Sequence, residues 1–88
     1  FGAETTKKFT AEEIRSCLEQ LQNAVQFGIV LRAKGIVAGE DGKWIHFDYV
    51  PGEADVRNGS AGVIGRLCVI GSKLDHHEIE ELFGVKEV

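Results

Sequence analysis

Residues 65–84, with the sequence GRLCVIGSKLDHHEIEELFG, place a strand directly before a helix whose start is well marked. Residues 61–70 are rich in Val, Ile and Leu and indicate a buried strand. Asp75 suits the N-cap of the helix, Glu78 stands three residues later as in a capping box, and Gly84 would end the helix. The residues expected to face the core are Ile79, Leu82 and Phe83. This strand–helix pair predicts a layered fold in which the helix packs on a sheet.

A second helix is expected near the N-terminus, with the same kind of start signal. Thr10 and Glu13 fit a capping box, and Gly28 suits a left-handed terminator. The apolar residues at helical spacing are Ile14, Cys17, Leu18, Leu21 and Val25. This spacing predicts one amphipathic helix between Thr10 and Gly28, with the five apolar side chains buried.

The region between the two helices is typical of strands. Residues 29–38 are rich in Ile and Val, and residues 43–49 place Ile45, Phe47 and Tyr49 on one face. Asp41-Gly42 between these segments is a strong hairpin signal. Pro51-Gly52 is expected to break the second strand.

Three further segments complete the expected sheet. Residues 53–57 lead to Asn58-Gly59, which is a second hairpin signal. Residues 3–9 would form an edge strand, whereas the sequence leaves open whether residues 85–88 add a final one. The predicted fold is therefore α+β, with an antiparallel sheet of four to five strands and two helices packed on one face, of ferredoxin-like type.

Length and composition indicate a single domain over residues 1–88. Hydrophobic residues make up 43% of the chain and charged residues 27%, which is ordinary for a globular domain. No apolar run approaches the roughly 18 residues that a membrane helix needs, so no membrane partner is expected. The net charge of −4 argues against nucleic acid as a partner, because binders of polyanions are more often basic.

The two cysteines do not suggest a disulfide framework. Cys17 falls on the apolar stripe of the first helix and Cys68 within the last strand. Both are interpreted as small buried hydrophobic residues, which fits a reducing cytoplasm as the expected location.

No catalytic motif is present in the chain. The sequence has no G-x-x-x-x-G-K-[ST] phosphate loop, no G-x-S-x-G elbow, and no C-x-x-C or H-E-x-x-H metal spacing. The acidic pairs Glu12-Glu13 and Glu80-Glu81 fit helix electrostatics and a solvated helix face. We therefore expect that this chain is not an enzyme.

The best candidates for a binding site share one face of the predicted sheet. Because Leu31, Ala33 and Val37 would face the helices, their neighbours fall on the open face. The interface candidates are Arg32, Lys34, Trp44, His46, Asp48 and Arg66. Trp and Arg are enriched at interface centres, which favours a docking surface. The alternative is an ordinary solvated face with cross-strand charge pairs.

Three histidines and one cysteine are weak candidates for a metal site. His76 and His77 are adjacent in the second helix and point about 100° apart, so they do not readily chelate one ion. His46 and Cys68 are the other side chains that could contribute. Imidazole suits zinc and nickel, but two exposed polar residues are the simpler interpretation of the His-His pair.

Short motifs between residues 30 and 83 resemble the C-terminal domain of CobW-like proteins, a family of metal-trafficking P-loop GTPases. They are LRAKGIV at residues 31–37, WIHFD at residues 44–48, and GRLCVIGS at residues 65–72 before Leu74-Asp75. The resemblance implies that the chain is excised from a longer protein with an N-terminal GTPase domain. It implies GTP, magnesium and a transition metal, zinc or cobalt, for that parent protein and no cofactor in this domain.

The resemblance also implies a role. It predicts an accessory domain of a GTP-dependent metallochaperone that helps deliver a metal or cofactor in cobalamin synthesis or metalloenzyme activation. The implied partners are the GTPase domain of the same protein and a client metalloprotein or metal-insertion complex. The alternative is an independent metal- or small-ligand-binding module that uses His46, His76, His77 or Cys68. A stand-alone enzyme and an RNA-binding domain are the least favoured hypotheses.

Overall fold

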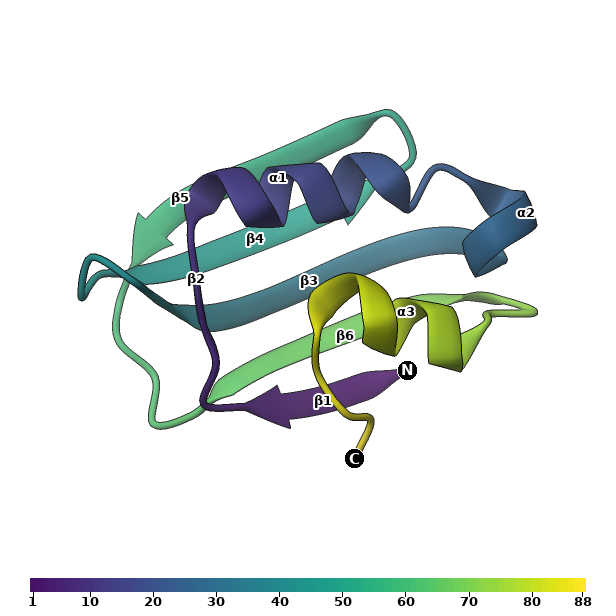
Figure 1. Ribbon diagram of the computed structural model, residues 1–88. Coiled ribbons are helices and arrows are strands. Elements are labelled where there is room, and N and C mark those ends of the chain that lie inside the picture. Colours follow the sequence, from purple (N-terminus) through teal and green to yellow (C-terminus); the bar gives the residue numbers. More distant parts are fainter.

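One sheet and three helices make up the computed structural model, which describes residues 1–88 (Figure 1). The strands are β1 (Gly2–Thr5), β2 (Lys8–Phe9), β3 (Ile29–Gly39), β4 (Trp44–Val50), β5 (Glu53–Gly59) and β6 (Gly65–Ser72). The helices are α1 (Ala11–Gln20), α2 (Ala24–Phe27) and α3 (His76–Phe83). None of these helices is long and apolar enough to cross a membrane.

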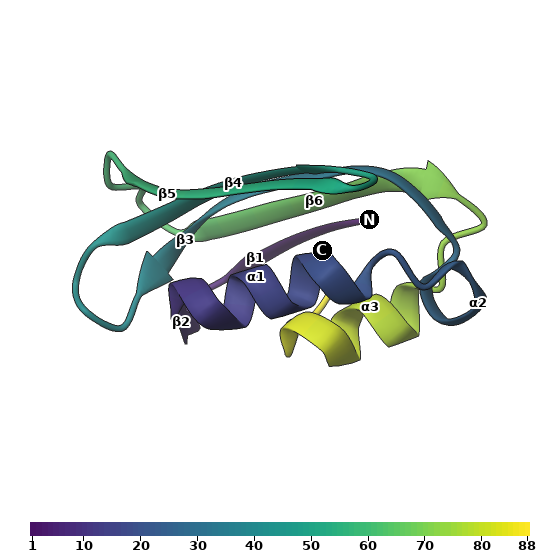
Figure 2. The same ribbon diagram turned by 90° about the horizontal axis from the view of Figure 1, so that it is seen from above.

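The sheet is mostly antiparallel, with the strand order β1-β6-β3-β4-β5. The two-residue β2 pairs in parallel with the end of β3. Seen from above, α1 and α3 lie on one side of the sheet and leave the other side bare (Figure 2). The predicted α+β class is confirmed, but the sheet has six strands and the helices number three instead of two.

The centre of the sheet joins segments from both ends of the chain. β1 and β3 each pair antiparallel with β6, so they run parallel to one another on either side of it. The connection from β1 through α1 to β3 is therefore a split β-α-β unit. The ferredoxin-like designation stays a prediction, because β4 and β5 extend the sheet further. Residues 85–88 add only an isolated bridge between Glu87 and Ala3.

The first helix begins as predicted and ends earlier. Glu13 N–H donates to Thr10 Oγ1 and Thr10 N–H donates to Glu13 Oε1, both at 3.1 Å, so the capping box is formed. The side chain of Asn23 then caps α2 by accepting from the Gln26 N–H at 3.2 Å. The prediction of one continuous helix is wrong, because the Asn23 side chain hydrogen-bonds to the local backbone and starts a separate short helix. Val25, predicted to be buried, is 99% exposed.

The last helix forms at the predicted position. Asp75 caps it by accepting from the Glu78 N–H at 3.1 Å, and Gly84 ends it in the left-handed region with φ 69°. The Glu78 carboxylate does not complete a capping box and accepts instead from Gln26 Nε2 at 3.0 Å. This hydrogen bond links α3 to α2.

One predicted hairpin forms and the other does not. Asp41-Gly42 lies in the turn between β3 and β4, as expected. Pro51-Gly52 makes the two-residue turn from β4 into β5, and Asn58-Gly59 lies inside β5. The hairpin predicted at Asn58-Gly59 is therefore wrong. The reason is the strand order, because β6 lies between β1 and β3 and not beside β5.

A bulge shifts the register at the start of β3. The pairing with β6 slips between Val30 and Arg32, so Val30 is 5% exposed and Leu31 is 56% exposed. The prediction that Leu31 faces the helices is wrong because the extra residue reverses the alternation. From Arg32 onward the predicted alternation holds, with Ala33 and Val37 fully buried.

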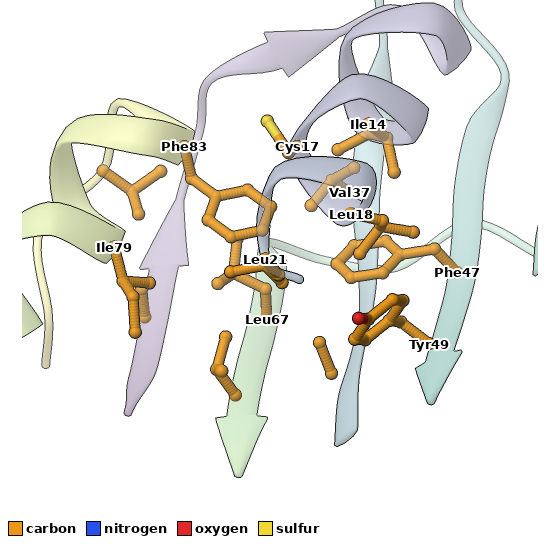
Figure 3. Packing of buried hydrophobic residues seen from close by; sticks show 14 of the residues in the cluster. Ile14, Cys17, Leu18, Leu21, Val37, Phe47, Tyr49, Leu67, Ile79 and Phe83 are labelled. Atoms are coloured by element: carbon orange, nitrogen blue, oxygen red, sulfur yellow. The ribbon is translucent and has the colours of Figure 1, made fainter. Parts of the chain in front are cut away.

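The hydrophobic core lies between the sheet and the helices (Figure 3). It contains 18 buried residues, and no polar or charged residue is buried with them. Phe47 of β4 stacks on Phe83 of α3 with ring centroids 6.4 Å apart. Cys17 is buried here as predicted, whereas Cys68 is only partly buried, on the other face.

Candidate functional site

The six interface candidates lie together on the sheet face that carries no helix, which we call the open face. The register places Lys34 of β3 opposite Asp48 of β4 and Cys68 of β6. Ile36 lies in the next row, between His46 and Arg66. The open-face residues of the three central strands are Arg32, Lys34, Ile36, Trp44, His46, Asp48, Arg66, Cys68 and Ile70.

Most charges on the open face are paired across strands. Asp48 accepts from Arg32 at 3.1 Å and lies 3.4 Å from Arg57 of β5. Arg57 also bonds Asp55 at 2.7 Å, and Arg66 bonds Glu4 of β1 at 2.9 Å. These side chains remain well exposed, so each ion pair contributes little to stability. The hydrogen bond from Arg32, followed by that from Arg57, lowers the pKa of the Asp48 carboxyl below its ordinary value.

Lys34 differs from the other cations of this face. Its ammonium group takes part in no ion pair, although β3 is the central strand of the sheet. The apolar side chains Ile36 and Ile70 on the same face are 38% and 50% exposed. A free cation beside exposed apolar surface is what a partner with a carboxylate and an apolar group would fit.

Trp44 and His46 contact the loop of residues 60–64, which follows β5. His46 Nε2 lies 2.8 Å from the Ser60 carbonyl oxygen, and its ring packs so closely on Gly59 that a Cβ there would come within 2.5 Å. A Cβ on Gly62 would lie 3.2 Å from the Trp44 ring. Both predicted residues therefore hold the loop of residues 60–64 in place.

A shallow concavity of about 710 Å³ lies on this face. Lys34, Ile36 and Arg66 line it from the sheet, and Val63 and Ile64 line it from the loop. The sequence interpretation did not include the loop or Arg57. Arg57 could have been predicted if residues 53–59 had been interpreted as a strand. Asp55 and Arg57 are then two residues apart and lie on the same face of that strand.

The four metal candidates do not converge. His76 Nδ1 lies 2.7 Å from Glu87 Oε1, and His77 Nε2 lies 3.5 Å from Glu81 Oε1. Both histidines belong to α3, on the opposite side of the sheet from His46 and Cys68 (Figure 2). No group of three His, Cys, Asp or Glu side chains is placed to hold a metal ion.

The fold and the open face together define a small α+β domain with one helix-covered and one uncovered sheet face. Residues 1–85 match the family described as the cobalamin synthesis protein cobW C-terminal domain. The chain therefore belongs to this family, which confirms the resemblance inferred from its short motifs. A search of curated proteins gives no significant match.

Two solved structures share the fold. The Zn(II)-bound YjiA GTPase from E. coli is 21% identical with a TM-score of 0.72, and the match covers 96% of this chain and 28% of that one. A Zn(II)-bound triple mutant of YjiA GTPase is 19% identical with a TM-score of 0.77, covering 99% and 29%. This chain thus spans less than a third of the length of either structure.

Proposed function

We propose that this chain is the accessory interaction domain of a cytoplasmic, GTP-dependent metallochaperone, and that its open face docks on the GTPase domain of the same protein. Membership of the cobW C-terminal domain family supports this proposal. So does the likeness to a Zn(II)-bound GTPase of which the domain matches only 28%. The parent protein would bind GTP, magnesium and zinc or cobalt, and would deliver a metal or cofactor to a client in cobalamin synthesis or metalloenzyme activation.

The observation that carries the proposal is the state of Lys34. This ammonium group has no ionic partner, while Arg32 and Arg66 on the same face each have one. The exposed side chains of Ile36 and Ile70 flank it with apolar surface. The central strand therefore presents an unpaired cation beside exposed apolar surface, and a partner carboxylate could pair with that cation.

The direct test is a charge reversal at Lys34. Lys34→Glu should weaken binding of this domain to the separately produced GTPase domain by on the order of tenfold or more, because it places like charge against the partner carboxylate. Isothermal titration calorimetry measures that affinity. Lys43→Glu is the matched control, since this exposed lysine lies in the β3–β4 turn and forms no ion pair.

A loss of affinity in the Lys34→Glu variant must also be distinguished from unfolding of the domain. Lys34→Glu places a second carboxylate opposite Asp48, so the thermal midpoint should fall slightly, by an amount corresponding to less than about 1 kcal/mol, and the domain should remain folded during the titration. Unchanged interdomain affinity, together with unchanged activation of the client by the full-length variant, would refute the docking role of the open face.

The concavity on the open face favours one alternative, a small-ligand-binding module. Its volume of about 710 Å³ is in the range of small-molecule sites. A titration of the domain with zinc or cobalt would distinguish this function. Micromolar binding that is lost on His→Ala changes, His46→Ala first, would favour it over the interaction role.

A further inference from the structure

The β5 strand leaves one long edge of the sheet unpaired. It is the last strand in the order, so β4 is its only neighbour in the sheet. Val50 and Glu53 flank the two-residue turn and form the first pair of the β4–β5 ladder. Since hydrogen-bonded and non-hydrogen-bonded pairs alternate along an antiparallel ladder, Ala54, Val56 and Asn58 turn their N–H and C=O groups away from β4. Three residues of β5 thus offer a template for another strand.

The sequence of β5, EADVRNG, is complementary to itself when read in the opposite direction. We propose that β5 pairs antiparallel with β5 of a second copy of this chain, about a two-fold axis at Val56. Ala54 then lies opposite Asn58 of the second copy, and the two Val56 residues lie opposite each other. These are the three positions whose backbone groups point outward, so every outward group finds a partner.

The same register also pairs the charges. Asp55 comes opposite Arg57 of the second copy and Arg57 opposite its Asp55, at non-hydrogen-bonded positions where facing side chains are closest. Both residues lie on the open face, because Asp55 pairs with Asp48 and Arg57 with His46. Within one chain Asp55 and Arg57 already bond at 2.7 Å, so the dimer would join two such pairs into a four-membered network.

Neighbouring registers do not satisfy both the outward backbone groups and the charges. A two-fold axis at Ala54 also matches outward groups, but it places Glu53 opposite Asp55, where like charges repel. An axis at Arg57 brings the two arginines face to face and turns inward-bonded groups to the interface. The register centred on Val56 is therefore the one in which backbone and charge agree.

This dimer would have a consequence for the open face. The two six-stranded sheets would become one continuous sheet, and the two open faces would form a single surface with two copies of Lys34. The contact involves few residues, so the association should be weak, with a Kd on the order of 0.1–1 mM for the isolated domain.

Complementary charge variants test the register. In the Asp55→Lys variant all charges at the two facing positions are positive, and in the Arg57→Glu variant all are negative. Each variant alone should dimerise on the order of tenfold more weakly than the wild type. An equimolar mixture should recover at least wild-type association, because every facing pair is then of opposite sign. Sedimentation velocity over a concentration series measures all three samples.

A matched pair of variants controls for net charge. Glu19→Lys and Arg15→Glu change the charge by the same amounts at exposed positions of α1 that form no ion pair. These variants should associate like the wild type, alone or mixed. If their mixture gained as much as the β5 mixture, attraction between oppositely charged proteins would explain the result and the proposal would be overturned.

Two further measurements locate the contact. On concentrating the wild type, the amide resonances of Ala54, Val56 and Asn58 should shift more than those of Asp55 and Arg57, whose N–H groups bond to β4. Ala54→Pro removes one outward N–H and leaves the β4 ladder intact, so it should abolish the association. A protein that remains monomeric up to about 1 mM, or that associates equally well with Ala54→Pro, would overturn the proposal.

Discussion

The two faces of the sheet are built from alternate residues of the same strands, yet they differ in what they contribute. The helix face supplies most of an 18-residue core that includes no polar or charged side chain. The open face has four ion pairs between exposed side chains, one unpaired lysine and a few exposed aliphatic residues. The contrast teaches that most of the stability comes from the helix-covered face, so substitutions on the open face should cost the fold less.

The sharpest test of this division compares two neighbouring apolar residues on opposite faces. Phe47 is 1% exposed and stacks on Phe83, so Phe47→Ala should lower the free energy of unfolding by about 3–5 kcal/mol. Ile36→Ala, on the open face, should cost only about 1–2 kcal/mol, because that side chain is 38% exposed and has less apolar area to lose. Urea denaturation of both variants measures the difference, and similar losses would contradict the division.

A glycine at the centre of the helix face gives the next largest expected effect. A Cβ on Gly35 would lie 2.6 Å from the Phe47 ring and 2.7 Å from the Arg66 carbonyl oxygen. Gly35→Ala should therefore cost about 1–3 kcal/mol through overpacking. Gly2→Ala in β1 is the control, because no atom lies within 4 Å of its added Cβ. The prediction fails if the two variants have equal urea midpoints.

The two cysteines, one on each face, allow the pH dependence of stability to be compared between the faces. Burial raises the pKa of the Cys17 thiol to about 11, from an ordinary value of 9.0. Because the folded protein holds this proton more tightly, the unfolded state loses it first, and stability falls as pH rises from about 9 towards 11, by on the order of 2 kcal/mol. Cys17→Ala should remove that part of the alkaline decline, whereas Cys68→Ala should retain it.

Thiol labelling gives an independent check on the cysteine prediction. An aromatic disulfide reagent should modify the partly buried Cys68 in the native protein and reach Cys17 only on unfolding. Rapid native labelling of Cys17 would contradict its burial on the inner side of α1, where its Sγ lies 3.5 Å from the Leu82 carbonyl oxygen of α3.

The smallest expected effect concerns the open-face carboxylate Asp48. Arg32 and Arg57 lower its pKa, so the stabilisation is complete above the ordinary carboxyl pKa and is lost as pH falls through the lowered value. Its size should be below about 1 kcal/mol, because the groups are exposed to solvent. Asp48→Asn should remove this part of the acid dependence, which a comparison of urea midpoints between pH 2 and pH 6 would detect. An identical acid profile in the variant would argue against the ion pairs.

Local signals in the sequence were sufficient for the elements that depend on neighbouring residues. The caps at Thr10 and Asp75, the turn at Asp41-Gly42 and the alternation along β4 all formed as predicted. The six open-face candidates followed from that alternation alone, because a strand places every second side chain on the same face. Their role in binding remains a prediction.

The errors arose where tertiary structure chose between local alternatives. Pro51-Gly52 and Asn58-Gly59 are both turn signals, and the pairing of β5 with β4 selected the first. The bulge at Leu31 reverses one step in the alternation of buried and exposed side chains along β3, and no local sequence pattern predicts it. The break at Asn23 could have been recognised, since Asn is a strong N-cap and the buried Phe27 follows four residues later.

The position of β6 between β1 and β3 has a consequence for how the chain folds. β3, β4 and β5 follow one another through short turns and can pair as soon as they are made, which favours rapid formation of this meander. β1 is synthesised first, but its only strand neighbour, β6, is the last strand to be made. β1 therefore cannot pair until β6 has been made. Until β1 docks, β6 presents a hydrogen-bonding edge to other chains. Closure of the β1–β6 pair should accordingly be the late step in folding and the stage most prone to aggregation.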